Sequence, residues 1–289
     1  MDDRRDGRER AFLQVGLSAV APRLYASFPW YDLPEMHCDT DALWAALVAA
    51  FRREGCAEVP PALDRTMPHG TDHHGGCFFT QTCGYPLLTT AREHFTVLGT
   101  PCYAVPGACG PLHRSFIVVR DDAAERAPEE LRGARFAINE TDSNSGMNLP
   151  RLLFAPLARG GRFFGSTVVT GSHARSAEAV SAGAADAAAI DCVTFALLRR
   201  YRPAAVERLR AIAETAATHA PPLVTSRAAD AGTVARLRRG VRAFFADPAF
   251  ATLRARLALT DVSFCDADAY DPVLGYERDA ARLGYPVLA

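Results

Sequence analysis

Runs rich in valine, isoleucine and phenylalanine alternate along this chain with segments whose apolar residues recur at helical spacing. This alternation indicates an α/β protein in which helices cover largely parallel sheets. The runs expected to form strands are residues 13–18, 77–81, 95–99, 116–119, 134–139, 167–170, 187–191, 210–214 and 223–227. Good N-cap residues predict helices from Asp39 or Thr40 to Arg53, from Ser172 to near Gly183, from Asp191 to near Tyr201, from Asp230 and from Asp247.

The stretch TPCYAVPGACGPLHR, residues 100–114, separates a first α/β unit from a second. The C-terminal helices need a sheet to cover, and returning them to the first unit gives them one. We therefore expect two lobes, one made of residues 1–110 and 220–289 and the other of residues 111–219. The chain then crosses between lobes near 101–115 and 214–224, leaving a ligand cleft between them.

Composition excludes several classes of function. The net charge of −1 gives no field that attracts nucleic acid. All 32 basic residues are arginine, so chemistry that needs a lysine amine is excluded. The longest apolar run, residues 42–51, is too short to cross a membrane. The eight cysteines form no Cys-x-x-Cys pair and are typical of buried small side chains.

Polar residues follow three of the predicted strands in the second lobe. DSNSG, residues 142–146, comes after one strand, Ser172 and His173 after the next, and Asp191 ends the third. In an open α/β sheet, ligands bind at the carboxyl ends of the strands, and helix N-termini there favour anions. Capping of the following helices is the alternative role for the same residues.

The motifs FTQTCGYPLLT, GPLHRSFIVVRDD, INETDSNSGMN and VTGSHARSAEAVSAGAADAAAIDCVTFALL, with their spacing, resemble the phosphate/phosphonate-type substrate-binding proteins of ABC transporters. The resemblance spans roughly residues 10 to 270. It implies a type 2 periplasmic-binding-protein fold: α/β, with two lobes, two crossovers and hinge closure on a small ligand. It also implies a monomer that captures a phosphorus oxyanion, such as phosphate, phosphite or an alkyl or aminoalkyl phosphonate, and serves a permease without catalysis, cofactor or metal.

Position by position, the resemblance implies a set of ligand-binding residues. They are Tyr31, Gln81, Thr82, Tyr103, Ser143, Asn144, Ser145, His173 and Asp191. A carboxylate repels a phosphoryl dianion, so Asp191 favours a ligand that brings an ammonium group or a protonated oxygen.

The chain departs from the family pattern in two places. The stretch DSNSG, residues 142–146, is the turn expected to hold the anion and is called the anion turn below. Pro150 and Pro156 interrupt the helix expected behind it, so we expect that helix to start late or to bend. The N-terminal segment is a weak secretion signal, because acidic residues interrupt its charged part. The resemblance implies a periplasmic location, and the weak signal leaves a cytoplasmic one open.

Three other functions are open on sequence alone. His69, Asp72, His73, His74 and Cys77 are of metal-ligand type, but their glycine-rich segment fits a solvated loop better. Ser143, His173 and Asp191 are the residue types of a catalytic triad, without the Gly-x-Ser-x-Gly elbow, and Cys83 near His94 is a candidate nucleophile. A cytoplasmic small-molecule sensor on the same cleft is the third alternative.

Overall fold

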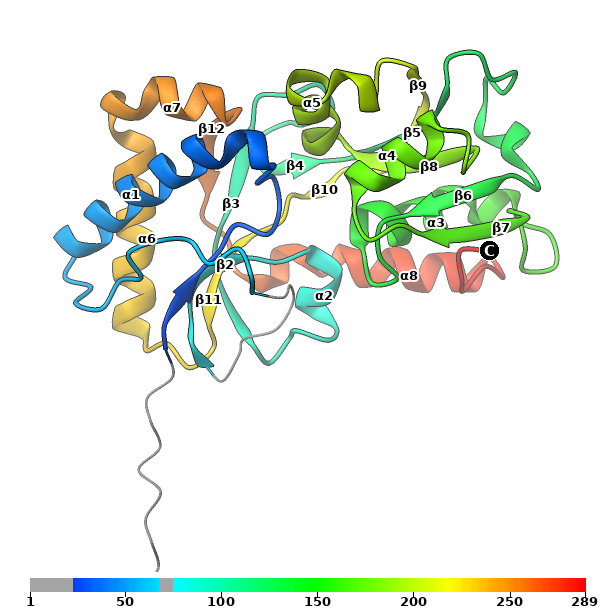
Figure 1. Cartoon of the computed structure of the whole chain (residues 1–289). Helices are drawn as coiled ribbons and strands as arrows, with labels where there is room; N and C mark the ends of the chain where they lie inside the picture. Colours follow the sequence, from blue (N-terminus) through cyan, green and yellow to red (C-terminus); the bar gives the residue numbers. More distant parts are fainter. Residues whose placement is uncertain (1–22, 68–74) are drawn as a thin grey trace, which may run out of the picture.

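The computed structural model describes residues 23–67 and 75–289. The described chain forms two α/β lobes, each built on a five-stranded sheet (Figure 1). The predicted two-lobe α/β fold is therefore confirmed. The expected strand at residues 13–18 and the histidines at 69, 73 and 74 lie outside the described residues.

The first lobe has the strand order β1-β2-β11-β3-β12. These strands are Tyr25–Ala26, Cys77–Gln81, Leu223–Ser226, Phe95–Tyr103 and Leu259–Ser263. Its helices are α1 (His37–Arg53), α2 (Gly84–Leu88), α6 (Ala231–Ala246) and α7 (Ala251–Arg256). The helix α1 begins before its expected caps, because Pro34 starts a 3₁₀ turn, Pro34–Met36, that runs directly into it.

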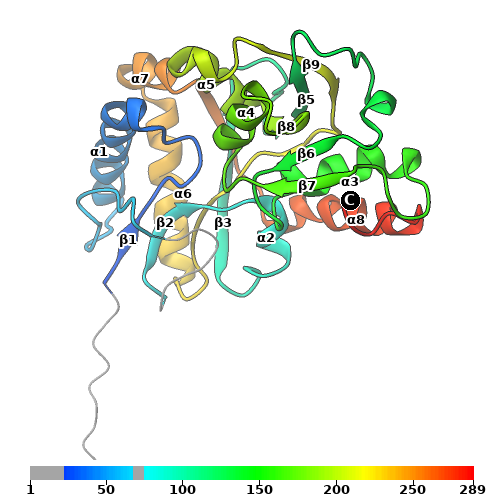
Figure 2. The same cartoon turned by 45° about the vertical axis from the view of Figure 1, so that its right-hand side comes forward.

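The second lobe has the order β7-β6-β8-β5-β9. These strands are Ser166–Val169, Arg135–Ile138, Ala187–Asp191, Ser115–Arg120 and Leu209–Glu214. Helices α4 (His173–Ser181) and α5 (Cys192–Tyr201) cover one face, and α3 (Leu149–Phe154) and α8 (Pro272–Arg282) the other (Figure 2). Both faces are thus buried, which explains why β5 reads as the apolar run FIVV.

The sheets are mixed, so the prediction of largely parallel sheets was wrong. Parallel pairing joins β1 with β2, β6 with β7 and β6 with β8, whereas β11, β12, β5 and β9 pair antiparallel with their neighbours. The physical reason is the passage between lobes. The strand β5 carries the chain into the second lobe and β9 carries it back, so the two run in opposite directions side by side.

Two short strands join the lobes. They are β4 (Leu112–His113) and β10 (Thr218–His219), which pair antiparallel with each other and with neither large sheet. Each lies within one of the expected crossovers.

The C-terminal helix α8 makes a further passage to the second lobe. Ala280, Tyr285 and Leu288 are buried there with Phe136 and Phe154. The expected assignment of residues 220–289 to the first lobe therefore fails from Ala280 onward, whereas Val273, at the start of α8, is buried in a cluster of the first lobe. The cause is a phenylalanine-rich face on the second lobe that the helices of its own segment leave partly uncovered.

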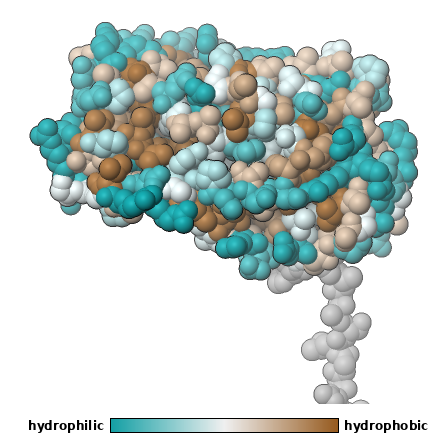
Figure 3. Space-filling view, turned by 180° about the vertical axis from the view of Figure 1, so that it is seen from behind, coloured by the Kyte–Doolittle hydropathy of each residue, from teal (hydrophilic) through white to brown (hydrophobic). Residues whose placement is uncertain are grey.

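The surface mixes hydrophilic and hydrophobic residues on the face seen in Figure 3. Within residues 23–67 and 75–289, no helix combines the length and the apolar character that a membrane crossing requires.

An aromatic cluster forms the core of the first lobe. The ring centroids of Trp44 and Phe79 lie 5.6 Å apart, and those of Phe51 and Phe79 lie 5.5 Å apart. The helix α6 approaches this cluster at Gly240, where an added Cβ would lie 2.4 Å from a ring carbon of Phe51. A residue with a side chain cannot occupy that position without moving α6 away from α1.

We expect Gly240→Ala to lower the free energy of unfolding by about 1–3 kcal/mol, because the overlap with Phe51 outweighs the gain in helix propensity. Gly275 in α8 is the matched control, since an added Cβ there meets no atom of the described residues within 4 Å. Gly275→Ala should raise stability by up to about 1 kcal/mol. Urea denaturation of both variants measures the difference, and equal effects would contradict this account of the core.

Candidate ligand site between the lobes

The stretch NETDSNSGMN forms a wide helical turn at the carboxyl end of β6. Ser143 caps the turn, and its Oγ accepts the Gly146 N–H at 3.0 Å. Residues Asn144–Asn148 then form a π-helical turn that continues into α3. The expected late start of this helix was therefore wrong, because helical backbone begins directly after Ser143. Ser143 therefore both caps the turn and lies at the edge between the lobes.

Pro150 leaves one carbonyl of the widened turn without a backbone donor. In π-helical geometry the N–H of residue 150 would donate to the carbonyl of Ser145, but proline has no N–H. The hydroxyl of Ser115, on β5, donates to that carbonyl instead, at 2.9 Å. A side chain from the neighbouring strand thus replaces the missing backbone donor and fixes Ser145 over the end of the sheet. Pro156 lies in the 3₁₀ turn Ala155–Leu157, where α3 ends.

His173 contacts the anion turn. Its Nδ1 lies 3.0 Å from the Ala189 carbonyl oxygen, which can only accept, so Nδ1 carries the hydrogen. Its Nε2 lies 2.8 Å from Ser145 Oγ. Burial lowers the pKa of His173, so the ring is neutral near pH 7 and Nε2 accepts the hydrogen of the serine hydroxyl.

Asp191 combines a structural and an electrostatic role. Its Oδ1 accepts the backbone N–H groups of Val193 and Thr194 at 3.1 and 3.0 Å and so caps α5. Its Oδ2 lies 3.5 Å from His173 Nε2. The Asp191 side chain is only 3% exposed. Among the described residues, no arginine forms an ion pair with this buried carboxylate.

Two tyrosines of the first lobe face this cluster. The rings of Tyr31 and Tyr103 pack edge to face, with centroids 5.2 Å apart. Burial, and then the charge of Asp191, raises the pKa of the Tyr31 phenol, so it stays protonated as a hydrogen-bond donor. Tyr31 has a φ of 60°, a strained conformation for a bulky residue that is typical of functional positions.

The strand β2 ends at Gln81, and Thr82 and Cys83 follow it opposite the anion turn. Gln81 Nε2 lies 3.5 Å from the Pro221 carbonyl oxygen, and the Thr82 hydroxyl is buried without a hydrogen-bond partner in the described part of the chain. The Asn144 N–H donates across the lobes to Cys83 Sγ at 3.3 Å. The expectation that free N–H groups of the turn form an anion site is therefore not met at Asn144 or at Gly146, whose N–H groups already have acceptors.

The structure thus brings the nine expected residues to the facing edges of the two lobes. Apart from Tyr31, which is half-buried, each is at most 9% exposed, so the lobes are closed around them. Sequence reasoning missed Ser115, which positions Ser145. Gly146 belongs to the stretch expected at this edge, but its close approach to Asn139, where an added Cβ would overlap the side chain, was not predicted. A serine at the start of a strand carries no signal that distinguishes it from other strand residues.

The catalytic alternatives do not match this geometry. Ser145, not Ser143, contacts His173, and a carbonyl oxygen, not a carboxylate, lies behind the ring. The Cys83 pKa is raised by burial, which keeps the thiol protonated. No group of three or more potential metal ligands occurs within the described ranges.

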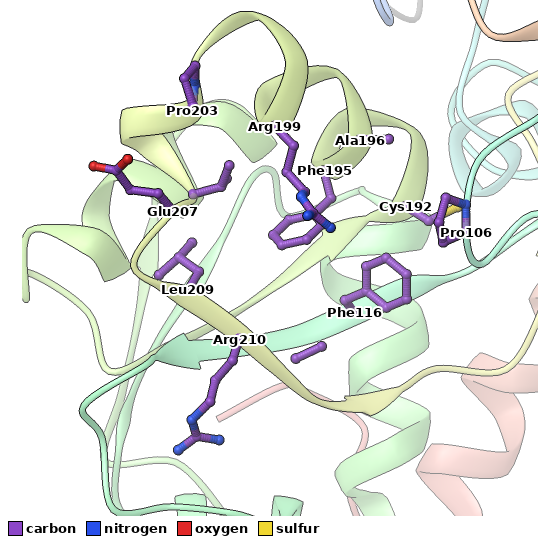
Figure 4. Close-up of a pocket in the computed structure, with 12 residues that line it drawn as sticks. Pro106, Phe116, Cys192, Phe195, Ala196, Arg199, Pro203, Glu207, Leu209 and Arg210 are labelled. Atoms are coloured by element: carbon purple, nitrogen blue, oxygen red, sulfur yellow. The ribbon is translucent and has the colours of Figure 1, made fainter.

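A separate pocket of about 680 Å³ lies on the second lobe (Figure 4). Its wall includes Phe116 and Phe195, and Arg199, Glu207 and Arg210 line it as well. None of the nine expected ligand residues lines this pocket, so its size alone does not make it the site. Tyr31, Gln81 and Tyr103 instead line a smaller apolar pocket of about 50 Å³ in the first lobe, together with Phe28 and Leu43.

Residues 80–270 match the protein family described as the periplasmic substrate-binding protein of the phosphonate ABC transporter. This match covers most of the chain. The chain belongs to this family. The substrate-binding role and the type of fold implied by the sequence motifs are therefore confirmed. No curated protein matches the chain closely enough to count as a relative.

Solved structures of such binding proteins share the fold. A phosphonate-transporter binding protein from Pseudomonas aeruginosa is 16% identical, with a TM-score of 0.70 over 91% of this chain and 88% of that one. PhnD1 from Prochlorococcus marinus, in complex with methylphosphonate, is 13% identical, with a TM-score of 0.63 over 90% and 99%. XAC2383 from Xanthomonas citri, bound to ATP, is 18% identical, with a TM-score of 0.66 over 90% and 98%. At these identities the likeness establishes the fold alone.

His113, on the crossover strand β4, provides a test of how strongly this junction is buried. Burial lowers its pKa to about 4; Asp191 opposes this shift, while His173 and His219 add to it. An unfolded histidine titrates near about 6.5, so between these values the unfolded chain binds more protons than the folded one. Stability contributed by neutral His113 is therefore present above about pH 6.5 and is lost as the pH falls.

We expect His113 to contribute about 2 kcal/mol to the loss of stability between pH 7 and pH 5. Urea denaturation of the wild type and of His113→Leu at both pH values isolates this contribution. The variant should lose less stability than the wild type over that interval. An identical pH dependence in the two proteins would show that His113 is not buried as described.

Proposed function

We propose that this chain binds a small phosphorus oxyanion between its lobes, with the anion turn and His173 on one side and the two tyrosines on the other. The observation that carries the proposal is the convergence of Ser145, His173 and Asp191 with Tyr31 across the closed junction. Family membership supports binding as the activity and places the family in the periplasm. We further propose that the chain acts there as a monomer that delivers its ligand to an ABC permease, without catalysis.

The hydrogen-bond polarity of the site limits the ligand. With a neutral His173, the Ser145 hydrogen is directed at Nε2, and the Asp191 carboxylate adds a second acceptor 3.5 Å from that nitrogen. A ligand with acceptors alone would face the Asp191 carboxylate without a donor for it. A ligand that also carries a donor, such as an ammonium group or a P–OH, satisfies that carboxylate.

The apolar pocket of the first lobe is an argument for a carbon substituent on that ligand. Tyr31, Gln81 and Tyr103 line a pocket that also contains Phe28, Trp30 and Leu43. Its volume of about 50 Å³ suits a short alkyl chain and not a large ring. We therefore propose alkyl and aminoalkyl phosphonates, with 2-aminoethylphosphonate as the member that combines the acceptor, donor and alkyl groups.

Asp191→Asn tests the donor part of this proposal. Asparagine is an equally good N-cap, so α5 should keep its start while the negative charge is lost. We expect the affinity for 2-aminoethylphosphonate to fall about 10- to 100-fold, the cost of one hydrogen bond between charged groups. The affinity for methylphosphonate, which has no ammonium group, should change little or improve.

Isothermal titration calorimetry of both proteins with both ligands measures these affinities. Equal weakening for the two ligands would exclude Asp191 as the ammonium partner. No heat with either ligand or with phosphate, from wild-type protein freed of bound ligand by unfolding and refolding, would refute phosphorus oxyanion binding. Phosphorus NMR of the same mixtures shows whether the ligand survives intact, and conversion would identify an enzyme.

An ion pair between the lobes supports closure as the mode of action. Arg202, at the end of α5, contacts Glu35, beside the start of α1, with Nε 2.7 Å from Oε1 and Nη2 3.1 Å from Oε2. Arg202 lowers the pKa of Glu35, as expected for a favourable pair. The pair is partly exposed, so its contribution is modest.

We expect Glu35→Gln to speed ligand dissociation by up to about fivefold, because the pair exists only while the lobes are together. Asp39→Asn is the matched control, since Asp39 pairs with Arg256 inside the first lobe at 2.7 Å. Stopped-flow measurements of dissociation compare the two variants. A similar acceleration in both would mean that the ion pair between the lobes has no special role in closure.

A further inference from the structure

His113 is a buried side chain at the junction for which neither the fold nor the proposed site yet gives a role. It lies on β4, in the two-stranded ladder that joins the lobes, opposite Thr218. Its side chain is 3% exposed. Its position in the linking ladder means that it belongs to neither sheet and borders both lobes.

The strand directions show which side of the chain His113 occupies. The next residue, Arg114, directs its side chain outward to the exposed Glu214. Neighbours in an extended chain point to opposite sides, so His113 and Ser115 share the other side. Ser115 lies directly opposite Asp191 in the ladder between β5 and β8, and its hydroxyl bonds to the Ser145 carbonyl. His113 therefore projects toward the face that carries Asp191 and the anion turn.

Electrostatics place the ring near the same cluster. The charges of both Asp191 and His173 act on the titration of His113, whereas that of His219 responds to burial alone. His219 is opposite Leu112 in the ladder, so it lies on the other face. His113 and His219 are thus neighbours in the ladder that joins the lobes, but of the two only His113 faces the proposed site.

The ring nitrogen Nδ1 of His113 is buried and has no hydrogen-bond partner among the described residues. The polar side chains around it are satisfied: Ser115, His173 and Asp191 all make hydrogen bonds. A buried polar atom without a partner is costly and rare, and therefore requires an explanation. An incoming ligand with an oxygen near Nδ1 supplies one.

We propose that His113 is a ligand-contacting residue whose Nδ1–H donates a hydrogen bond to an oxygen of the bound phosphorus oxyanion. This inference rests on the proposed function. It also adds a donor on the side of the site where Ser145 donates to His173 and Asp191 is an acceptor. A neutral imidazole provides that donor without changing the charge that Asp191 sets.

Three substitutions separate this role from a packing role. His113→Leu removes the hydrogen bond. His113→Asn keeps a donor at the Nδ1 position, because its amide nitrogen is the same number of bonds from Cα. His113→Asp is nearly the same shape as asparagine but, when ionised, has only acceptors. His219→Gln is the control on the opposite face of the same ladder.

Calorimetric titration with methylphosphonate should show about 10- to 100-fold weaker binding for His113→Leu, the cost of a hydrogen bond to a charged group. We expect His113→Asn to stay within about threefold of the wild type, His113→Asp to bind as weakly as the leucine variant or worse, and His219→Gln to match the wild type. Thermal melts without ligand confirm that each variant is folded.

The outcomes separate this inference from the proposed function. A wild type that binds none of methylphosphonate, phosphate and 2-aminoethylphosphonate refutes both. Wild-type binding with an unaffected leucine variant refutes only the role of His113. Equal losses in the asparagine and leucine variants, or tight binding by the aspartate variant, overturn the donor role.

A measurement on the unaltered chain covers the case in which the variants do not fold. Wild-type protein labelled with ¹⁵N-histidine should show one Nδ1 resonance that shifts on addition of methylphosphonate besides that of His173. His173→Gln identifies the second resonance. No such shift in a protein that binds methylphosphonate would also refute the contact.

Discussion

The pairing of β5 with β8 is the constraint on which the site depends. This register sets Ser115 beside Asp191 at the edge between the lobes. From there the Ser115 hydroxyl reaches the Ser145 carbonyl that Pro150 leaves without a backbone donor. Ser145 in turn bonds to His173, whose other nitrogen is held by the backbone of β8. A shift of one residue in this register would turn Ser115 to the opposite face and leave Ser145 unsupported.

Much of the fold could be predicted from local patterns. Apolar runs located β2 and β8 at their observed bounds, and the caps Ser172, Asp191 and Asp230 located the starts of three helices. These signals are local, because a cap satisfies N–H groups within its own turn. Strand direction and the destination of α8 depend on contacts between distant segments. Neither leaves a trace in the spacing of apolar residues.

The residues expected at the site meet at the junction, but their partners could not be predicted. The sequence shows four polar residues in DSNSG without indicating that Ser143 caps the turn while Ser145 reaches His173. That division follows from the wide turn, in which the Ser145 carbonyl accepts a hydrogen bond from Ser115, a serine 30 residues earlier. Likewise, the sequence allows Asp191 to be either a helix cap or a ligand-binding residue. In the structure Oδ1 caps α5, whereas Oδ2 faces His173. A sequence motif does not show that one side chain has two structural roles.

The contact between Cys83 and the Asn144 N–H makes the reactivity of this thiol depend on whether the lobes are closed. The thiol is buried while the lobes meet, and its acceptor role is lost when they part. Its alkylation rate therefore reports the fraction of molecules that are open, as hydrogen exchange reports local opening. Cys38 and Cys109 are exposed and provide an internal reference for reagent activity. An oxidised Cys83 would be larger and more polar than the thiol, so it would not fit the buried contact with the Asn144 N–H.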